Sequence, residues 1–213
     1  MPTPWLEEVV QKLRSRPRQS LAPKRVWDAD LEREIIQAPQ EQLLGDAAAK
    51  KEDVLALKAG LLLWNDSLDA SHRFSQQVHS TLGSYWHGIM HRMEGDYSNA
   101  KYWFRMTGEH PVFEPLQRKW SNHKDEFRSG PASQSAPSGL NGGHGGTVAE
   151  RLARLAANDR WDPFAFVDLV AQTVAIGTKT ETEWVERVQR WEMELLLNYT
   201  YQRCCGGTLI ETG

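Results

Sequence analysis

The chain has 213 residues, of which 25% are charged and 40% hydrophobic, and its formal net charge at pH 7 is −3. This slightly acidic balance argues against a general nucleic-acid-binding protein, because such proteins carry a basic face that neutralises phosphates. Apolar runs such as positions 61–64 are far shorter than the ~20 residues needed to cross a bilayer, so we expect no membrane span.

The cysteines and the N-terminus bear on the cellular compartment. The chain has two cysteines, Cys204 and Cys205, which are adjacent and therefore cannot join distant segments by a disulfide bond. Glu7 and Glu8 lie where a secretory signal would need an apolar run. We therefore expect a cytoplasmic protein, with the nucleus as the alternative.

Residues 1–27 form the first region and are rich in basic residues and proline. They contain six basic residues, two acidic ones and prolines at positions 2, 4, 17 and 23. This composition predicts a flexible basic arm, which either stays solvated or docks on a partner. Within it, a short amphipathic pattern runs through Trp5, Leu6, Val9, Val10 and Leu13.

Residues 28–128 are predicted to form a helical block with a central hairpin. Apolar residues recur at helical spacing around Leu31 and Ile35, and again from Val54 to Leu62. The run at positions 83–111 is typical of two antiparallel helices that meet near Gly95. The next segment, 129–146, is dominated by Gly, Ser and Pro, so it is predicted to be a flexible loop.

Residues 147–213 carry several helix-start signals and are predicted to pack as C-terminal helices on the same core. Thr147 and Glu150 have the spacing of a capping box, and Thr180 and Glu183 repeat it. Asp162 before Pro163 predicts a further helix start, and Gly206 suits a left-handed helix end. Because no alternating strand pattern of useful length occurs, the predicted fold class is all-α.

The central run also resembles a known repeat. The residues Gly88, Gly95-Asp96-Tyr97, Ala100, Phe104 and Pro111 resemble the second half of one tetratricopeptide repeat, with a fainter copy at Gly60, Leu68 and Ser71. Together with positions 61–76 and 161–168, this run is also similar to an uncharacterised all-helical protein family of fungi and bacteria. The resemblance implies stacked antiparallel helix hairpins, degenerate in their repeat, and no particular chemistry.

Five of the seven histidines fall between positions 72 and 110. His87 and His91 are one helical turn apart, with Glu94 three residues further, and His79 lies at the start of the same region. Imidazole and carboxylate groups at this spacing suit a divalent metal such as zinc, so His79, His87, His91 and Glu94 are candidate ligands. Buried histidines hydrogen-bonded between helices are the alternative. The glutamate of the metalloprotease pattern is missing after His87.

Two further groups of residues are candidates for a site. Asp69 and His72 share a helical face, so the carboxylate could orient the imidazole as a general base, although cap and turn roles explain the same residues. A second set combines aromatic, amide and cationic side chains that either line a ligand groove or belong to the core and its solvated rim. Its members are Trp64, Gln76, Trp86, Arg92, Lys101 and Trp103.

These patterns leave three hypotheses about function. The leading one is a helical scaffold that binds a protein or peptide partner through a central aromatic and polar groove. The alternative is an enzyme that acts on a small molecule or depends on a divalent metal, with a pocket lined by His and Glu between helices. The third is a structural subunit whose N-terminal arm docks on a larger assembly.

Overall fold

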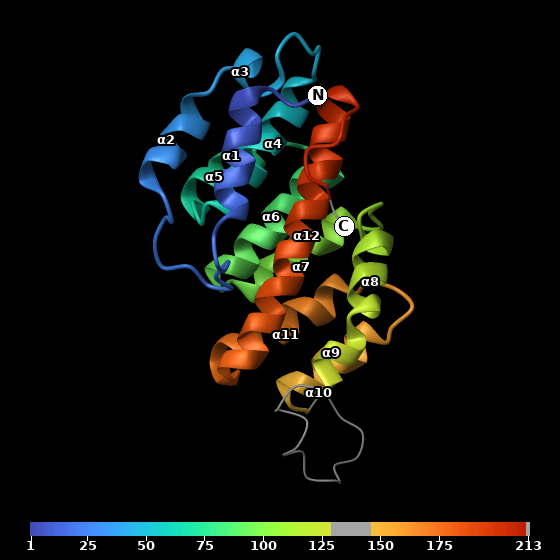
Figure 1. Cartoon of the computed structure of the whole chain (residues 1–213). Helices are drawn as coiled ribbons and strands as arrows, with labels where there is room; N and C mark the ends of the chain where they lie inside the picture. Colours follow the sequence, from blue (N-terminus) through green and yellow to red (C-terminus); the bar gives the residue numbers. More distant parts are fainter. Residues whose placement is uncertain (129–145, 212–213) are drawn as a thin grey trace.

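The computed structural model describes residues 1–128 and 146–211, and within these ranges it is all-helical, with no β-strand (Figure 1). This confirms the predicted fold class for the described residues. None of the helices in these ranges combines the length and the apolarity that a membrane span requires. In chain order the helices are α1 (Pro4–Arg14), α2 (Ala29–Gln37), α3 (Gln40–Leu44), α4 (Lys51–Trp64), α5 (Leu68–Ser75), α6 (Thr81–Glu94), α7 (Tyr97–Thr107), α8 (Phe113–Asn122), α9 (Lys124–Arg128), α10 (Val148–Ala156), α11 (Pro163–Ile176) and α12 (Lys179–Cys205).

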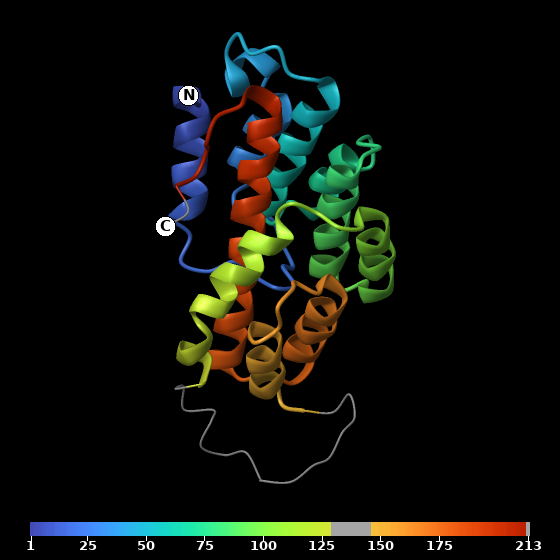
Figure 2. The same cartoon turned by 90° about the vertical axis from the view of Figure 1, so that its right-hand side faces the viewer.

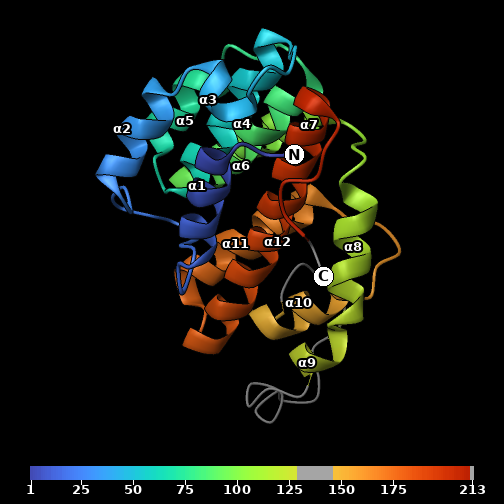
Figure 3. The same ribbon diagram turned by 45° about the horizontal axis from the view of Figure 1, so that its top comes forward.

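The last helix, α12, is the longest at 27 residues and runs through the middle of the molecule. Its upper half packs on α4, and its lower half contacts α8, α10 and α11. Figure 3 shows α12 between the helices α1 to α5 on one side and α8 to α10 on the other. Because it touches both groups, α12 joins them into one core, to which it contributes Val185, Val188, Leu196, Leu197 and Tyr201.

Helices α6 and α7 form the central hairpin, shown side by side in green in Figure 2. Gly95 ends α6 with a φ of 92°, a left-handed conformation that favours glycine, and the Asp96 side chain caps α7. Gly88 lets the two helices approach, since a Cβ there would lie 3.2 Å from the ring of Phe104. The hairpin itself is therefore present, whereas the tetratricopeptide-like stacking stays a prediction.

Residues 1–27 do not form the predicted flexible arm. Helix α1 buries Leu6, Val9, Val10 and Leu13 in the core and contacts α3. The basic side chains that suggested a solvated arm are partly paired, as in the contact of Lys12 with Asp28 at 2.7 Å. Burial of the short amphipathic stripe outweighs the solvating effect of the charges around it.

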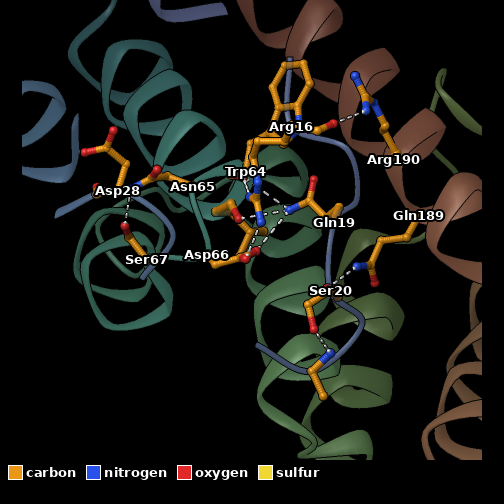
Figure 4. Close-up of polar contacts among 12 residues, drawn as sticks. Arg16, Gln19, Ser20, Asp28, Trp64, Asn65, Asp66, Ser67, Gln189 and Arg190 are labelled. Carbon is orange, nitrogen blue, oxygen red and sulfur yellow. Dashed lines mark hydrogen bonds and ion pairs between the residues drawn. The ribbon is translucent and has the colours of Figure 1, made fainter. Parts of the chain in front are cut away.

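The segment that follows α1 is held by a polar network at the C-terminal end of α4 (Figure 4). Arg16 donates to the Trp64 carbonyl and lies 2.5 Å from the Asp66 carboxylate, while Gln19 Nε2 is 3.4 Å from both the Leu63 and the Trp64 carbonyl oxygens. These carbonyls are at the end of a helix, where backbone acceptors lack partners within the helix. Arg16 and Gln19 therefore cap α4 from a distant part of the sequence.

Helix α12 holds the same segment from its other side. Gln189 Nε2 donates to the Ser20 carbonyl at 3.2 Å, and Arg190 donates to the carbonyls of Arg14 and Arg16 at 2.8 and 3.3 Å. Figure 4 shows Arg16 and Gln19 between α4 and these two side chains of α12. The segment consequently connects the end of α4 with the middle of α12.

In the last region, two of the three predicted helix starts and the predicted helix end are correct. Thr147 and Glu150 form a capping box, Asp162 caps α11, and Gly206 ends α12 with a φ of 78°. The Thr180–Glu183 box is wrong, because α12 begins two residues earlier with a box formed by Thr178 and Glu181. The predicted flexible loop at 129–146 lies outside the described residues except for Gly146.

A tertiary contact accounts for the earlier start of α12. Glu181 is buried, and its Oε1 also accepts a hydrogen bond from the backbone nitrogen of Ala149 at 3.0 Å, in the first turn of α10. One carboxylate thus caps two helices. Such a contact favours the box at Thr178 over the one at Thr180, whose local spacing is equally good.

We expect Arg16→Ala to lower the free energy of unfolding by about 3–5 kcal/mol, because it leaves the buried Asp66 carboxylate and the end of α4 without their cationic partner. Urea unfolding followed by circular dichroism would measure this loss. Arg118→Ala is the matched control: Arg118 pairs with Glu114 on the exposed face of α8, so its loss should cost below about 1 kcal/mol. Equal effects of the two substitutions would contradict the capping role of Arg16.

Candidate metal centre

Three histidine side chains from two helices meet beside the central hairpin. His72 comes from α5, and His87 and His91 come from α6. One ligand nitrogen from each lies within 4.8 Å of the other two. In the described part of the chain, this histidine triad is the group of His, Cys, Asp or Glu side chains placed to hold a metal ion.

Local sequence explains how the histidine triad is assembled. His87 and His91 are four residues apart and so lie on the same face of α6. His72 is brought to that face by the tight connection between α5 and α6. Gly83 permits this connection, because a Cβ at this position would lie only 2.1 Å from the Val78 carbonyl oxygen.

Residues of α7 and of the end of α6 contact the histidine triad. The Trp103 indole lies parallel to the His87 ring, with centroids 4.0 Å apart. Glu94 Oε2 is 3.0 Å from His91 Nδ1, and Asn99 Nδ2 is 3.1 Å from His91 Nε2. His72 is only half-buried, as are Asn99 and Trp103, so the histidine triad is not fully enclosed.

Burial keeps the histidines of α6 uncharged. Burial, with smaller contributions from the neighbouring His72 and His91, lowers the pKa of His87 to about 4. Burial also lowers the pKa of His91, against the opposing effect of the Glu94 carboxylate. Both rings are therefore neutral near pH 7, which is the form that binds a metal.

Of the four predicted metal ligands, two belong to the histidine triad and two do not. His87 and His91 belong to the histidine triad. His79 is exposed in the connection between α5 and α6 and lies outside the triad, and Glu94 contacts a ring nitrogen of His91 instead of joining the group of ligands. His72, which the sequence paired with Asp69, takes the third position.

The predicted catalytic pair of Asp69 and His72 is not assembled. Asp69 is exposed and lines a pocket of about 420 Å³ together with Asp66 and Arg73, whereas His72 faces the other histidines. No hydrogen bond or ion pair joins Asp69 to His72 in the part of the chain that the structure describes. The two residues lie on one helix, as predicted, but their side chains have different surroundings and do not pair.

The predicted ligand-binding residues divide into core and surface. Trp64 and Trp86 are at most 1% exposed, and the Trp86 Nε1–H donates to Thr200 at 3.2 Å. Lys101 forms an ion pair with Asp168 at 2.6 Å at the surface, and Gln76 is exposed. Trp103 is the member of this set that contacts the histidine triad.

Arg92, the remaining member, is fully buried in a polar network between α6 and α12. Its guanidinium pairs with Glu192, and both side chains are 0% exposed. Gln189 Oε1 accepts from Arg92 Nε at 3.3 Å, and the Tyr85 hydroxyl donates to Glu192 at 3.1 Å. Burial and the Glu192 charge raise the pKa of Tyr85 well above its usual value, so the hydroxyl keeps its proton. Arg92 therefore supports the core instead of lining a groove.

Comparisons with protein-family models, curated proteins and solved structures gave no match for this chain. The interpretation of the histidine triad therefore depends on its own geometry.

We expect stability to fall as the pH drops from about 6.5 toward 4. Because the pKa of His87 is about 4 in the folded protein and 6.5 ordinarily, the unfolded chain takes up its proton first and is favoured over this range. Urea unfolding at a series of pH values should give a shallower decline for His87→Gln. His110, buried with a pKa of about 4, should account for part of the remaining decline.

The exposed His79 provides the control for this experiment. His79→Gln should leave the pH dependence of the unfolding free energy unchanged, because its side chain is solvated in both states. If the unfolding free energy depended on pH equally in wild type and His87→Gln, the His87 ring would not be desolvated in the folded protein. That result would contradict the structure.

Proposed function

We propose that this protein binds a divalent transition metal, with zinc the best match, through His72, His87 and His91. The observation that carries this proposal is the convergence of three ligand nitrogens within 4.8 Å from two separate helices. Three imidazoles suit zinc among the common metals, and other borderline ions such as Cu²⁺ or Ni²⁺ share this ligand preference.

The distances indicate how far the side chains must move on binding. Tetrahedral coordination with Zn–N bonds of about 2.0–2.1 Å places ligand nitrogens roughly 3.4 Å apart. The nitrogens of the histidine triad lie within 4.8 Å of one another, so the widest pair would need to close by up to about 1.4 Å. Rotation of the half-buried His72 side chain provides such a movement without shifting the helices.

The number of ligands supports a functional site over a purely structural one. Structural zinc sites usually have four protein ligands, whereas three protein ligands leave a position for water or a small molecule. A metal in such a site lowers the pKa of bound water and polarises a bound carbonyl or phosphoryl oxygen. We therefore favour the metal-dependent alternative among the functions considered from the sequence.

The hypothesis of a peptide-binding scaffold has less support. Its groove cannot include Trp64 and Trp86, because their side chains are buried. Tyr102 and Met106 on α7 are the exposed large apolar residues nearest in sequence to Trp103, at 49% and 54% exposure. A protein or peptide partner at this face of α7 stays a prediction.

The chelator-treated protein should bind one Zn²⁺ per chain in a calorimetric titration. His72→Ala, His87→Ala and His91→Ala should each weaken binding by more than ~100-fold, since losing a direct ligand costs more than losing its hydrogen-bond partner. Circular dichroism should show that each variant keeps its helices.

His79→Ala is the matched control, a histidine of the same connection whose side chain is exposed. It should bind zinc as tightly as wild type. Failure of the wild-type protein to bind zinc, or equal binding by all four variants, would contradict the proposed site.

A further inference from the structure

We propose that Glu94 is a positioning residue of this centre: it holds the His91 proton on Nδ1 and so directs Nε2 to the metal. The inference rests on the proposed function, and it adds which nitrogen coordinates and which residue selects it. The sequence had suggested Glu94 as a direct ligand.

The contact between Glu94 and His91 carries the argument. The two residues are three apart in the last turn of α6, and the carboxylate Oε2 lies 3.0 Å from Nδ1. A carboxylate only accepts hydrogen bonds, and a neutral imidazole has one N–H to donate. The pair therefore forms a good hydrogen bond in only one tautomer of His91, with the proton on Nδ1 and the lone pair on Nε2.

The same geometry argues against Glu94 as a ligand. The two ring nitrogens of an imidazole point in different directions, so a carboxylate bound at Nδ1 faces away from an ion at Nε2. In agreement, the group of converging ligand atoms contains the three histidines without Glu94. Coordinating histidines commonly donate their second N–H to a carboxylate in this way.

Asn99 leaves the Nε2 lone pair available. Its Nδ2 is 3.1 Å from Nε2 and 3.5 Å from Nδ1 of His91, so the amide lies beside the ring between its two nitrogens and not along one lone pair. Asn99 is itself fixed at the start of α7, where its backbone nitrogen donates to Asp96 at 3.0 Å. Asn99 therefore limits the tilt of the His91 ring, whereas the choice of tautomer is left to Glu94.

Exposure is consistent with a positioning role. The Glu94 side chain is 53% exposed and the His91 side chain 8% exposed, so the carboxylate keeps much of its hydration while it orients a buried ring. Substituting Glu94 consequently removes the orienting group with little damage to the core.

Glu94→Gln tests the inference, because glutamine keeps the shape of the side chain but can also donate, which removes the tautomer preference. Zinc affinity should fall by about 10–100-fold relative to wild type. Glu94→Asp, which keeps the carboxylate on a shorter side chain, should recover part of the loss. Glu109→Gln, at an exposed surface ion pair with Arg160, is the matched control and should bind zinc like wild type.

Imidazole ¹⁵N spectra of the zinc-free protein give a second readout that a purely structural role would not change. The wild-type His91 ring should carry its proton on Nδ1, and Glu94→Gln should shift it toward a mixture of tautomers. Wild-type zinc binding with unchanged affinity in Glu94→Gln would overturn this inference and leave the proposed function intact. A His91 proton on Nε2 in wild type would also overturn it, and absence of zinc binding in wild type would overturn both.

Discussion

The buried ion pair between Arg92 and Glu192 is the contact on which the arrangement around α6 depends. Both side chains are fully removed from solvent, so a turn of α6 about its axis would leave two charges unpaired in the interior, at a cost of several kcal/mol. This fixes one face of α6 against α12. His91 precedes Arg92 in the chain and, with His87, therefore faces α5 and α7. The position of the histidine triad therefore follows from a constraint on another side of the same helix.

Local patterns predicted the elements of the fold, because capping and helix reversal depend on residues close together in the chain. The Thr147 box, the Asp162 cap and the glycine turn at Gly95 are of this kind. The failures occur where a distant contact decides. Residues 1–27 looked flexible because nothing near Arg16 and Gln19 in sequence shows that these side chains cap α4. The choice of Thr178 over Thr180 likewise depends on a hydrogen bond to α10.

In the candidate site, too, features set by local spacing could be predicted, whereas features set by distant contacts could not. The spacing of His87 and His91 is enough to place them on one helical face, so this pair could be predicted. His72 could not be assigned to them, because its position depends on the close approach at Gly83 and Val78. Arg92 was misread as a surface cation because its partner is 100 positions away. Trp103 was grouped with a ligand groove, whereas its ring lies against His87.

Charge explains what kind of ligand such a centre would favour. The two buried arginines described above meet an opposite charge, since Arg92 pairs with Glu192 and Arg16 pairs with Asp66. In the histidine triad, burial keeps the two α6 rings neutral, and two carboxylates act on His91: Glu94, which contacts it, and Asp96. A divalent cation bound by three neutral imidazoles would carry two positive charges, which Glu94 and Asp96 would offset only in part, because the Glu94 side chain is 53% exposed and screened by solvent. An anion in the fourth position would offset the remaining charge. The site should therefore prefer small anionic ligands over neutral ones of the same size.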